Sequence, residues 1–395
     1  MAPGMEEGGL ILTFNAGSST VKLGFYEIAG NGLSAIGRGV IDFRDEPLEV
    51  RLTLAGEKHA EPLSAADTGD MADVLSAAFA AIGRHLDLSR VRVAAHRVVH
   101  GGDVFSGPAR LTATTLAQIR ELAALAPLHQ PQSLKLIDAI AALRPSLMQT
   151  ASFDTAFHAT QMPLARRFAL PRALHDQGIK RYGFHGLSYR YIAGELAKIA
   201  DLPPDAKVVA AHLGSGASLC AMRGGESVDS SMGFSTLDGI PMATRCGALD
   251  PGVLLHLMGP MGMSLERVET LLYRESGLLG VSGFEADCRE LLESGRPEAA
   301  DAIGLFTLRI AGEAARLAAS LGGLDALVFT AGIGEHQPAI RAGVAERLQW
   351  LGLDLDGEAN ARNAPRISAA SSRVKAFVIP TDEERVIAGE ALSLL

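Results

Sequence analysis

The sequence predicts an α/β protein with two domains, built on duplicated mixed sheets with flanking helices. A chain of 395 residues is longer than one hydrophobic core normally supports, so its length favours two domains. Residues 9–40 and 206–234 share one layout, in which a strand, a turn rich in Gly and Ser and a second strand lead to another turn and strand. After each of these segments, helical periodicity alternates with short apolar runs. The repeated layout indicates that the second half starts the fold again.

Composition excludes several classes of function. Hydrophobic residues make up 48% of the chain and charged residues 21%, which is typical of a globular protein with a sizeable core. The net charge is -9 and no block of Lys and Arg occurs, so neither nucleic acid nor a membrane surface is an expected partner. We expect no signal peptide and no membrane span. Cys220, Cys246 and Cys288 lie far apart, which favours a reducing, cytoplasmic location.

The first half reads as an antiparallel sheet followed by helices and buried strands. Residues 10–28 predict two strands joined by a polar turn, and two more strands are expected at 33–43 and 48–54. Apolar residues at helical spacing predict a helix over 72–86. The next elements are a buried strand ending in a Gly-Gly turn, two helices closed by proline, and a strand ending at Asp154, over residues 91–103, 112–127, 133–145 and 147–157.

The second half repeats the strand pattern and then adds longer helices. Strands over 206–234 are followed by helices over 264–275, 286–294 and 298–321. Residues 324–352 predict a strand, a Gly-rich turn and a helix whose first turn contains Pro338. Residues 374–395 predict a strand and a helix capped by Thr381 or Asp382. No low-complexity linker separates the halves, so we place their boundary between 150 and 200, in a contact region.

Three Gly-rich turns follow apolar strands and point to an anionic ligand. They read NAGSST (15–20), HLGSGAS (212–218) and AGIGEH (331–336). Glycine lets a ligand approach the backbone closely, and successive N–H groups form an anion-binding concavity. The common nucleotide and hydrolase signatures, GxxxxGK[ST], GxGxxG and GxSxG, do not occur in the chain. A phosphate-binding device in this protein therefore belongs to another fold.

Polar residues at strand ends are the candidates for chemistry. Arg97 ends a buried strand, at the sheet edge where ligands bind in α/β proteins, and either an anionic ligand or a structural carboxylate would compensate its charge. Asp154 occupies a position typical of a metal ligand or a general base. Arg245 lies in a loop before a helix, and Glu383 opens a helix, where it also suits the helix dipole. The histidines show no zinc-ligand spacing.

Ten segments, in this order and spacing, resemble the acetokinase family of the acetate and sugar kinase, Hsc70 and actin superfamily. They are NAGSSTVK, HRVVHGG, PLHQP, FDTAFH, RYGFHG, HLGSGAS, MGFSTLDG, TRCGALDPG, TAGIGEH and TDEE. The resemblance runs nearly from end to end. It implies a two-domain, actin-like (ribonuclease H-like) ATPase fold. Its acceptor-side domain would comprise 1–155 with 383–395, and its nucleotide-binding domain 156–382.

The resemblance also implies an activity and its cofactors. ATP and acetate would give ADP and acetyl phosphate in a reversible reaction that requires Mg²⁺ or Mn²⁺, carried out by a homodimer. The implied catalytic residues are Asp154, His185 and Arg245. The implied metal ligands are Asn15 and Glu383. The implied acetate site has Arg97 for the carboxylate, with Val99, Leu128, Phe184 and Thr236 as lining. The implied nucleotide contacts are Ser18, Thr20, Lys22, His212, Leu213, Gly214, Ser215, Gly216, Asp287, Cys288, Arg289, Gly332, Ile333, Gly334, Glu335 and His336.

The chemistry of such a reaction justifies these residue types. Phosphoryl transfer depends on alignment and on stabilisation of charge on the phosphoryl oxygens. A carboxylate acceptor is already deprotonated near neutral pH, so the difficulty is to bring two anions together. Two arginines, a histidine and a divalent cation answer that difficulty. On this basis Asp154 is expected to orient Mg²⁺ or Arg97 rather than to remove a proton.

The sequence departs from the family pattern at several positions. Ser215 replaces a common asparagine in the Gly-rich turn, and Cys288 replaces a large apolar residue between two nucleotide contacts. Leu187 and Tyr189 stand where threonine and histidine are frequent, and Thr236 stands where proline usually lines the methyl pocket. A change of one or two methylenes in a pocket wall alters discrimination by only about 1–3 kcal/mol, so propionate or a broader range of short carboxylates is the alternative substrate.

Two other classes of function are also compatible with this fold. A sugar kinase would need a base beside a hydroxyl and a polar pocket, which Arg97, Arg245 and the apolar lining oppose. A nucleotide-binding switch or scaffold would carry long insertions, and none is evident in the sequence.

Overall fold

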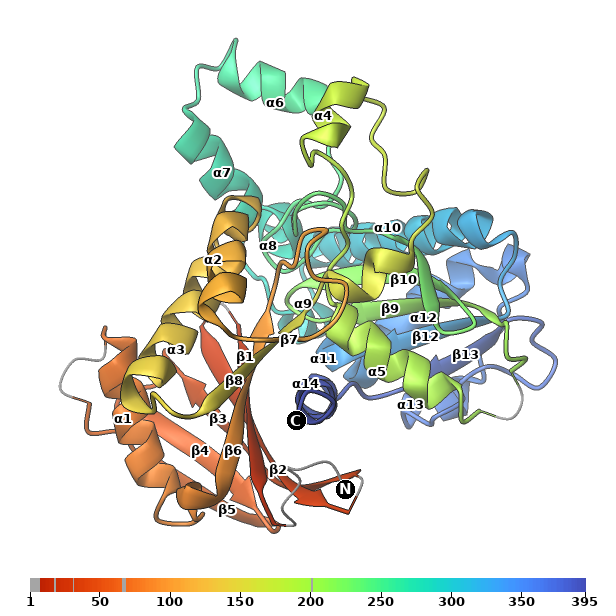
Figure 1. Cartoon of the computed structure of the whole chain (residues 1–395). Helices are drawn as coiled ribbons and strands as arrows, with labels where there is room; N and C mark the ends of the chain where they lie inside the picture. Colours follow the sequence, from red (N-terminus) through yellow and green to blue (C-terminus); the bar gives the residue numbers. More distant parts are fainter. Residues whose placement is uncertain (1–7, 18, 31, 66–68, 200–201) are drawn as a thin grey trace. The chain divides into compact units, whose positions relative to one another are not determined.

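The computed structural model describes residues 8–17, 19–30, 32–65, 69–199 and 202–395, so the predicted contact Ser18 lies outside the described residues. The chain forms two compact units (Figure 1). Unit 1 comprises Met1–Phe157 and Asp382–Leu395, and unit 2 comprises His158–Thr381. Unit 1 is therefore discontinuous in sequence. In the described part of the chain, no helix is long and apolar enough to cross a membrane.

Unit 1 is built on a mixed sheet. Its strands are β1 (Leu10–Ala16), β2 (Thr20–Ala29), β3 (Gly32–Asp42), β4 (Glu49–Leu54), β5 (Glu57–Pro62), β6 (Val91–Val98), β7 (Ala109–Arg110) and β8 (Met148–Phe153). They lie in the order β5-β4-β3-β2-β1-β6-β8-β7. β1 to β5 form an antiparallel meander, whereas β1, β6 and β8 are mutually parallel. The carboxyl ends of β1, β6 and β8 therefore share one edge of the sheet.

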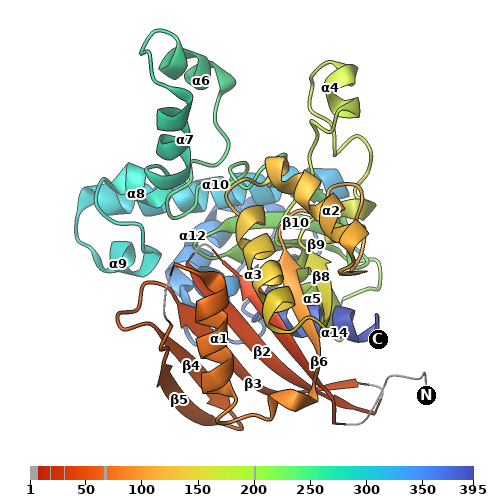
Figure 2. The same ribbon diagram turned by 60° about the vertical axis from the view of Figure 1, so that its left-hand side comes forward.

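Helices cover both faces of the central strands of unit 1. In both views, α1 (Met71–Ile82) and α3 (Gln130–Leu143) lie on one face and α14 (Glu383–Leu392) lies on the other (Figures 1 and 2). α2 (Ala113–Glu121) precedes α3. Leu12 and Phe14 belong to a buried cluster with Val74 of α1 and Ile140 of α3. Burial on both sides explains why β1 is apolar at nearly every position.

Unit 2 repeats this sheet topology. Its strands are β9 (Lys207–Leu213), β10 (Ala217–Arg223), β11 (Glu226–Ser230), β12 (Ala326–Thr330) and β13 (Lys375–Val378). They lie in the order β11-β10-β9-β12-β13. β9, β10 and β11 are antiparallel, and β9, β12 and β13 are parallel. The same pattern relates β3, β2, β1, β6 and β8 in unit 1, so the duplication predicted from the Gly/Ser turns is confirmed.

Two helices of unit 2 pack on opposite faces of its sheet. They are α5 (Gly186–Leu196) and α10 (Pro297–Leu321) (Figures 1 and 2). Three helices extend away from this sheet, namely α4 (Arg172–Asp176), α6 (Pro251–Met258) and α7 (Leu265–Arg274) (Figure 2). The remaining helices are α8 (Gly277–Ser282), α9 (Cys288–Glu293), α11 (Ala331–His336), α12 (Pro338–Arg347) and α13 (Gly357–Ala361).

Most predicted elements are confirmed, but α4, α5, α8 and α13 were not predicted, and other details differ. β5 was not expected, because EKHAEP carries too few apolar residues to read as a strand, and it forms by pairing with β4. The predicted Gly-rich turn at 331–336 is the short helix α11, which starts with Ala331 at a positive φ of 63°. His212 lies within β9 rather than in a turn. Of the two predicted caps of α14, Asp382 is the one that accepts a hydrogen bond, from the Arg385 amide at 2.9 Å.

Gly183 allows the segment before α5 to approach a buried histidine. Its φ is +82°, a conformation that L residues with a Cβ rarely adopt. A Cβ at this position would lie 2.6 Å from the imidazole ring of His158, which is itself buried. Both the backbone conformation and the close approach therefore require glycine.

We expect Gly183→Ala to lower the free energy of unfolding by at least about 1–3 kcal/mol, the cost of a strained backbone position, with the steric clash in addition. Gly194→Ala is the matched control. Gly194 lies in the exposed interior of α5 with open space around it, so alanine there should stabilise by about 0.5–1 kcal/mol. Urea unfolding followed by circular dichroism measures both. Equal effects of the two substitutions would contradict this account.

His96 makes the stability of unit 1 sensitive to acid. It is 1% exposed and stacks on Phe14, and burial lowers its pKa to about 4, partly opposed by its hydrogen bond to Gln149. An unfolded histidine has a pKa of about 6.5, so below that pH the unfolded chain binds a proton that the folded chain does not. Stability therefore falls as the pH falls from about 6.5 towards 4.

Between pH 6.5 and 5, we expect His96 to reduce the free energy of unfolding by about 2 kcal/mol. His96→Gln keeps a side-chain amide near Gln149 and removes the titrating ring. The variant should lose this part of the pH dependence in urea unfolding measured across that range. An unchanged slope in the variant would show that His96 does not carry the effect.

Candidate functional site

In unit 1, the ends of β6 and β8 bring together a buried ion pair. Arg97 precedes the last residue of β6, and Asp154 follows β8 directly. Arg97 donates two hydrogen bonds to Asp154, from Nε to Oδ1 at 3.0 Å and from Nη2 to Oδ2 at 2.6 Å. The side chains are 15% and 1% exposed. Asp154 thus holds the guanidinium in a fixed plane by a bidentate contact.

Asn15 connects this pair to two glutamates at the start of α14. Its Oδ1 accepts a hydrogen bond from Nη1 of Arg97 at 3.1 Å. Its Nδ2 donates to Glu383 Oε2 and to Glu384 Oε1, both at 2.8 Å. Nη1 of Arg97 also lies 3.9 Å from Oε2 of Glu383. The structure therefore joins Asn15, Arg97, Asp154 and Glu383, which are far apart in sequence, and adds Glu384.

The charges of this cluster are mutually dependent. Burial disfavours the charged form of Arg97, but attraction by Asp154 and Glu383 outweighs it and raises the pKa of the arginine above its usual range. Burial, followed by repulsion from Asp382 and Glu384, raises the pKa of Tyr26 well above its ordinary value, so the phenol stays neutral. Tyr26 hydroxyl donates to Asp382 at 3.4 Å.

In unit 2, two stacked histidines are each held by a serine. The rings of His185 and His212 lie 4.3 Å apart between centroids, with 18° between their planes. Nδ1 of His185 is 2.8 Å from Ser218 Oγ, and Nδ1 of His212 is 2.8 Å from Ser188 Oγ. His185 lies at the N-cap of α5 with φ 56°, and this left-handed conformation turns its ring towards β10. Both histidines therefore have a fixed ring orientation.

The turn after β9 lies against these histidines and Arg245. A methyl group built on Gly216 would be 3.5 Å from Nε2 of His185 and 3.9 Å from Nη1 of Arg245. One on Gly214 would be 4.0 Å from Nε2 of His212. Nitrogen atoms of His185, His212 and Arg245 thus lie within 4.0 Å of the positions that the glycines leave without a side chain, together with the carbonyl oxygen of Gly216 and the methyl group of Ala331. Arg245 Nη1 also donates to the backbone oxygen of Thr236 at 3.3 Å.

Arg341 organises the third Gly-rich segment from inside the protein. It is 0% exposed and donates to the carbonyl oxygens of Gly334 at 2.8 Å and Glu335 at 3.0 Å. It also donates to Asn360 Oδ1 at 2.7 Å and to Asn363 Oδ1 at 2.6 Å. Burial lowers its pKa to about 10. These bonds tie the carbonyl end of α11 to the body of unit 2.

The other predicted nucleotide contacts occupy varied surroundings. Asp287 caps α9 by accepting from the Arg289 amide at 2.8 Å, and Cys288 is buried with its pKa raised to about 12 by desolvation and by Asp287. Glu335 accepts from the Thr381 amide at 3.2 Å, next to the serine that holds His212. Lys22 is an exposed residue of β2, and Thr20 begins that strand. The remaining predicted positions are Leu213 and Ser215 beside the glycine turn, and Gly332, Ile333 and His336 in α11.

The predicted lining of the acetate site divides between the two units. Val99 and Phe184 are 4% and 1% exposed, Leu128 is half-buried, and Thr236 is 8% exposed. Val99 and Leu128 belong to unit 1, whereas Phe184 and Thr236 belong to unit 2. Each is sufficiently buried to serve as a pocket wall in its own unit.

Sequence reasoning missed the residues that support the predicted ones. Glu384 shares Asn15 with Glu383, and the repeated acid in TDEE was the available signal. Ser188 and Ser218 hold the histidines, but a single serine gives no distinctive pattern in a sequence. Arg341 lies on a helix beyond AGIGEH and reads as an ordinary helical arginine until its burial is known.

Metal binding would depend on the two glutamates of α14. Across residues 8–17, 19–30, 32–65, 69–199 and 202–395, no three His, Cys, Asp or Glu side chains are grouped to hold a metal ion. Mg²⁺ commonly takes only one or two carboxylates and completes its shell with waters and substrate phosphates, so Glu383 and Glu384 fit that ion. Asn15 turns its nitrogen to them and its oxygen to Arg97, which suits a role in orienting the carboxylates.

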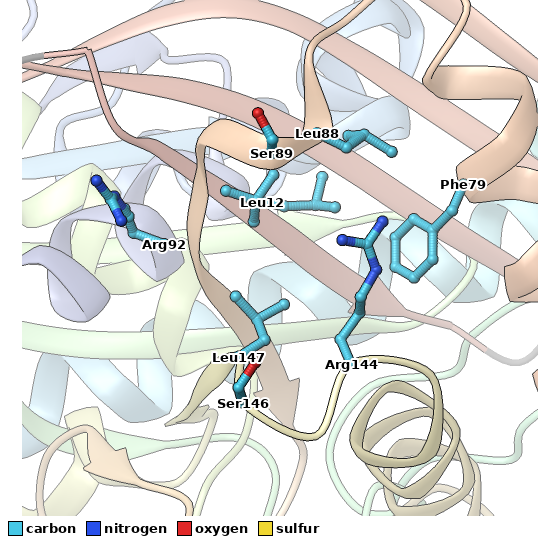
Figure 3. A pocket seen from close by; sticks show the side chains of 9 residues that line it. Leu12, Phe79, Leu88, Ser89, Arg92, Arg144, Ser146 and Leu147 are labelled. Carbon is cyan, nitrogen blue, oxygen red and sulfur yellow. The ribbon is translucent and has the colours of Figure 1, made fainter.

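A separate cavity of unit 1 contains none of the predicted site residues. Its volume is about 310 Å³, and it lies near the first residues of β6, at the opposite end of that strand from Arg97 (Figure 3). Leu12, Val91 and Leu147 contribute apolar walls. Arg144 lies beside Phe79, with its guanidinium carbon 5.7 Å from the ring centroid.

Comparison with known proteins gives one consistent result. The model of the Acetokinase family matches residues 10–389. Proteins named acetate kinase from Rhodopseudomonas palustris (strain TIE-1) and Nitrobacter hamburgensis are 48% and 46% identical, covering 96% and 98% of this chain and 96% of each relative. A propionate kinase structure from Francisella tularensis has a TM-score of 0.89 at 35% identity, covering 97% of this chain and 98% of its own. The Porphyromonas gingivalis acetate kinase structure has a TM-score of 0.86 at 33% identity, covering 98% and 99%.

We expect Asp154→Asn to lower the free energy of unfolding by about 3 kcal/mol, because it leaves Arg97 buried without its bidentate partner. Asp138→Asn is the control, since it breaks the ion pair of Asp138 with Arg120, whose side chains are 45% and 50% exposed. Breaking that pair should cost less than about 1 kcal/mol. Urea unfolding at neutral pH distinguishes the two. An Asp154 effect no larger than the control would mean that the pair contributes little to stability.

Proposed function

Because this chain belongs to the acetokinase family, we propose that it is an acetate kinase, which transfers the γ-phosphoryl group of ATP reversibly to the carboxylate of acetate. The products are ADP and acetyl phosphate. The family match over residues 10–389 carries this proposal, and relatives named acetate kinase at up to 48% identity support it. The predicted family and the predicted actin-like fold are both confirmed. We further propose that unit 1 is the acceptor side and unit 2 the nucleotide-binding domain.

Arg97 is the proposed acetate ligand. Its Nε, Nη1 and Nη2 each donate one hydrogen bond within unit 1, which accounts for three of the five guanidinium N–H groups. The two remaining guanidinium N–H groups are enough to bind the two oxygens of a carboxylate. Since acetate reacts in its ionised form, the reaction needs no strong base. Asp154 is therefore a positioning residue, which fixes the plane of Arg97 and keeps its charge.

The cationic and N–H groups of unit 2 are the proposed phosphoryl ligands. His185 and Arg245 direct ring and guanidinium nitrogens at the Gly214–Gly216 turn, where the backbone leaves room for phosphate oxygens. The N-terminal N–H groups of α11 would add donors of the same kind. Thr20 and Lys22, the predicted contacts on β2, belong to unit 1 and are proposed as further phosphate ligands. Such donors stabilise the charge spread over the phosphoryl oxygens during transfer.

Mg²⁺, or Mn²⁺ in its place, is the proposed metal. Glu383 and Glu384 would hold it, and Asn15 would keep their carboxylates in register by its two 2.8 Å hydrogen bonds. When bound, the ion would supply charge neutralisation between phosphate oxygens. The chain's own part is to orient both carboxylates through Asn15.

Similarity to proteins named acetate kinase favours acetate as the acceptor. The relatives named acetate kinase reach 48% identity, whereas the solved structure named propionate kinase shares 35%. Thr236, at the position of a frequent proline, is a buried part of unit 2 and the residue to exchange when acetate and propionate are compared.

A homodimer is proposed as well, because α6, α7 and the segment before α4 expose large apolar side chains, among them Leu164 at 83% and Leu255 at 74%. A cytoplasmic location likewise stays a proposal.

The proposed activity is tested by hydroxamate formation. Purified protein with acetate, Mg-ATP and hydroxylamine should give acetyl hydroxamate, and the rate should fall to background when the divalent ion is chelated. Parallel assays with propionate and butyrate rank the acceptors. Absence of product with all three carboxylates would refute a carboxylate kinase.

Arg97→Lys tests the acetate ligand while leaving Asp154 a cationic partner. We expect the KM for acetate to rise at least about tenfold, because the bidentate guanidinium contact worth about 1.5–3 kcal/mol is lost. The KM for ATP should change little. Arg92→Lys, an exposed position on the same strand, is the control and should leave both constants unchanged. An unchanged acetate KM in Arg97→Lys would remove Arg97 from the acceptor site.

A further inference from the structure

A buried row of hydroxyl groups lies behind His185 in unit 2. Ser218 Oγ is 2.8 Å from Nδ1 of His185 and 2.5 Å from the hydroxyl of Tyr189. Tyr189 and Ser218 are both 0% exposed. Ser218 contacts Nδ1 of His185, whereas Nε2 is the nitrogen near Gly216. The two hydroxyl groups and the glycine turn therefore lie at different nitrogens of the ring. The row therefore contacts the ring without blocking its outward nitrogen.

The secondary structure places these three groups together. Tyr189 follows His185 by four residues, and its amide donates to the His185 carbonyl at 3.1 Å, while both side chains contact Ser218 Oγ. Ser218 lies on β10, directly opposite His212 of β9. Tyr189 stands where the family resemblance leads one to expect histidine, so the phenol is a feature of this chain.

The contacts fix which nitrogen of His185 faces the glycine turn. Nδ1 lies 2.8 Å from Ser218 Oγ, and Ser218 Oγ in turn contacts the Tyr189 hydroxyl. Nε2 is consequently the nitrogen near Gly216. Burial dominates and raises the pKa of the Tyr189 phenol well above its ordinary value, so the phenol stays neutral and keeps its hydroxyl in this row.

We propose that Tyr189 and Ser218 are positioning residues that hold Nδ1 of His185 and thereby aim its Nε2 at the phosphoryl group. This inference rests on the proposed phosphoryl-transfer function. Nη1 of Arg245 lies near the same glycine as Nε2 of His185, so both nitrogens would contact the same group. His212 is held separately, through Ser188 and Thr381, and so does not compete for Ser218.

Tyr189→Phe and Ser218→Ala test the proposal in the full-length protein. Each should lower kcat by about five- to tenfold, the equivalent of one orienting hydrogen bond, with the KM values for acetate and ATP within about twofold. Ser218→Thr restores the hydroxyl and should recover most of the loss relative to Ser218→Ala. Tyr191→Phe is the matched control, because it removes a phenol from the same helix outside this row. An unchanged kcat in Tyr189→Phe, or no recovery in Ser218→Thr, would overturn the proposal.

A second readout does not depend on turnover. In ¹⁵N-histidine-labelled protein, Nδ1 and Nε2 of His185 should show the separate resonances of one fixed tautomer, and Ser218→Ala should mix the tautomers. His185→Gln identifies the resonance. A wild-type ring that exchanges between tautomers, or a spectrum indifferent to Ser218, would overturn the positioning role. If no carboxylate is phosphorylated but the ring is held in one tautomer, the proposed function fails while the hydrogen-bond row stands, so the two failures are distinguishable.

Discussion

The parallel alignment of β1, β6 and β8 is the constraint on which the unit 1 site depends. Parallel strands end at one edge, so Asn15, Arg97 and Asp154 meet there although Asn15 is 82 positions from Arg97 in the chain and Arg97 is 57 from Asp154. A guanidinium in that place must be compensated, and Asp154 does so with both oxygens. The acidic start of α14 then completes a cluster in which every charge has a neighbour of opposite sign or a hydrogen-bonding amide.

Unit 2 uses the same sheet pattern to produce a different surface. The strands β9, β10 and β12 again combine an antiparallel pair with a parallel one. Here the turn between β9 and β10 is left bare by glycine, and the end of β12 leads directly into α11. Arginine and histidine nitrogens surround the bare turn, whereas carboxylates dominate the start of α14 in unit 1. A duplicated scaffold thus carries two different sets of side chains, on which the proposed carboxylate and metal site of unit 1 and the proposed phosphate site of unit 2 rest.

The sequence was most informative where backbone geometry and chemistry coincide. Arg97 and Asp154 could be predicted because each follows a strong apolar strand, and strand ends are where α/β folds bind ligands. Ser218 could not be predicted. It contacts His185 only because β10 pairs with β9 in one register and α5, which precedes both strands in the chain, lies beside them. The glycines of 331–336 predicted a turn, whereas the structure has a short helix whose last carbonyl groups accept hydrogen bonds from Arg341. The register of β10 against β9 and the burial of Arg341 leave no pattern in the sequence, so neither could be predicted.

The split composition of unit 1 has a consequence for how the molecule comes into being. Asp382–Leu395 is translated only after all of His158–Thr381, yet it supplies both glutamates beside Asn15 and covers one face of the first sheet. During synthesis, that face of the unit 1 sheet therefore stays uncovered until unit 2 has been translated. Arg97 can pair with Asp154 early, but Asn15 gains Glu383 and Glu384 only in the last step, so a nascent or prematurely terminated chain carries an incomplete charge cluster.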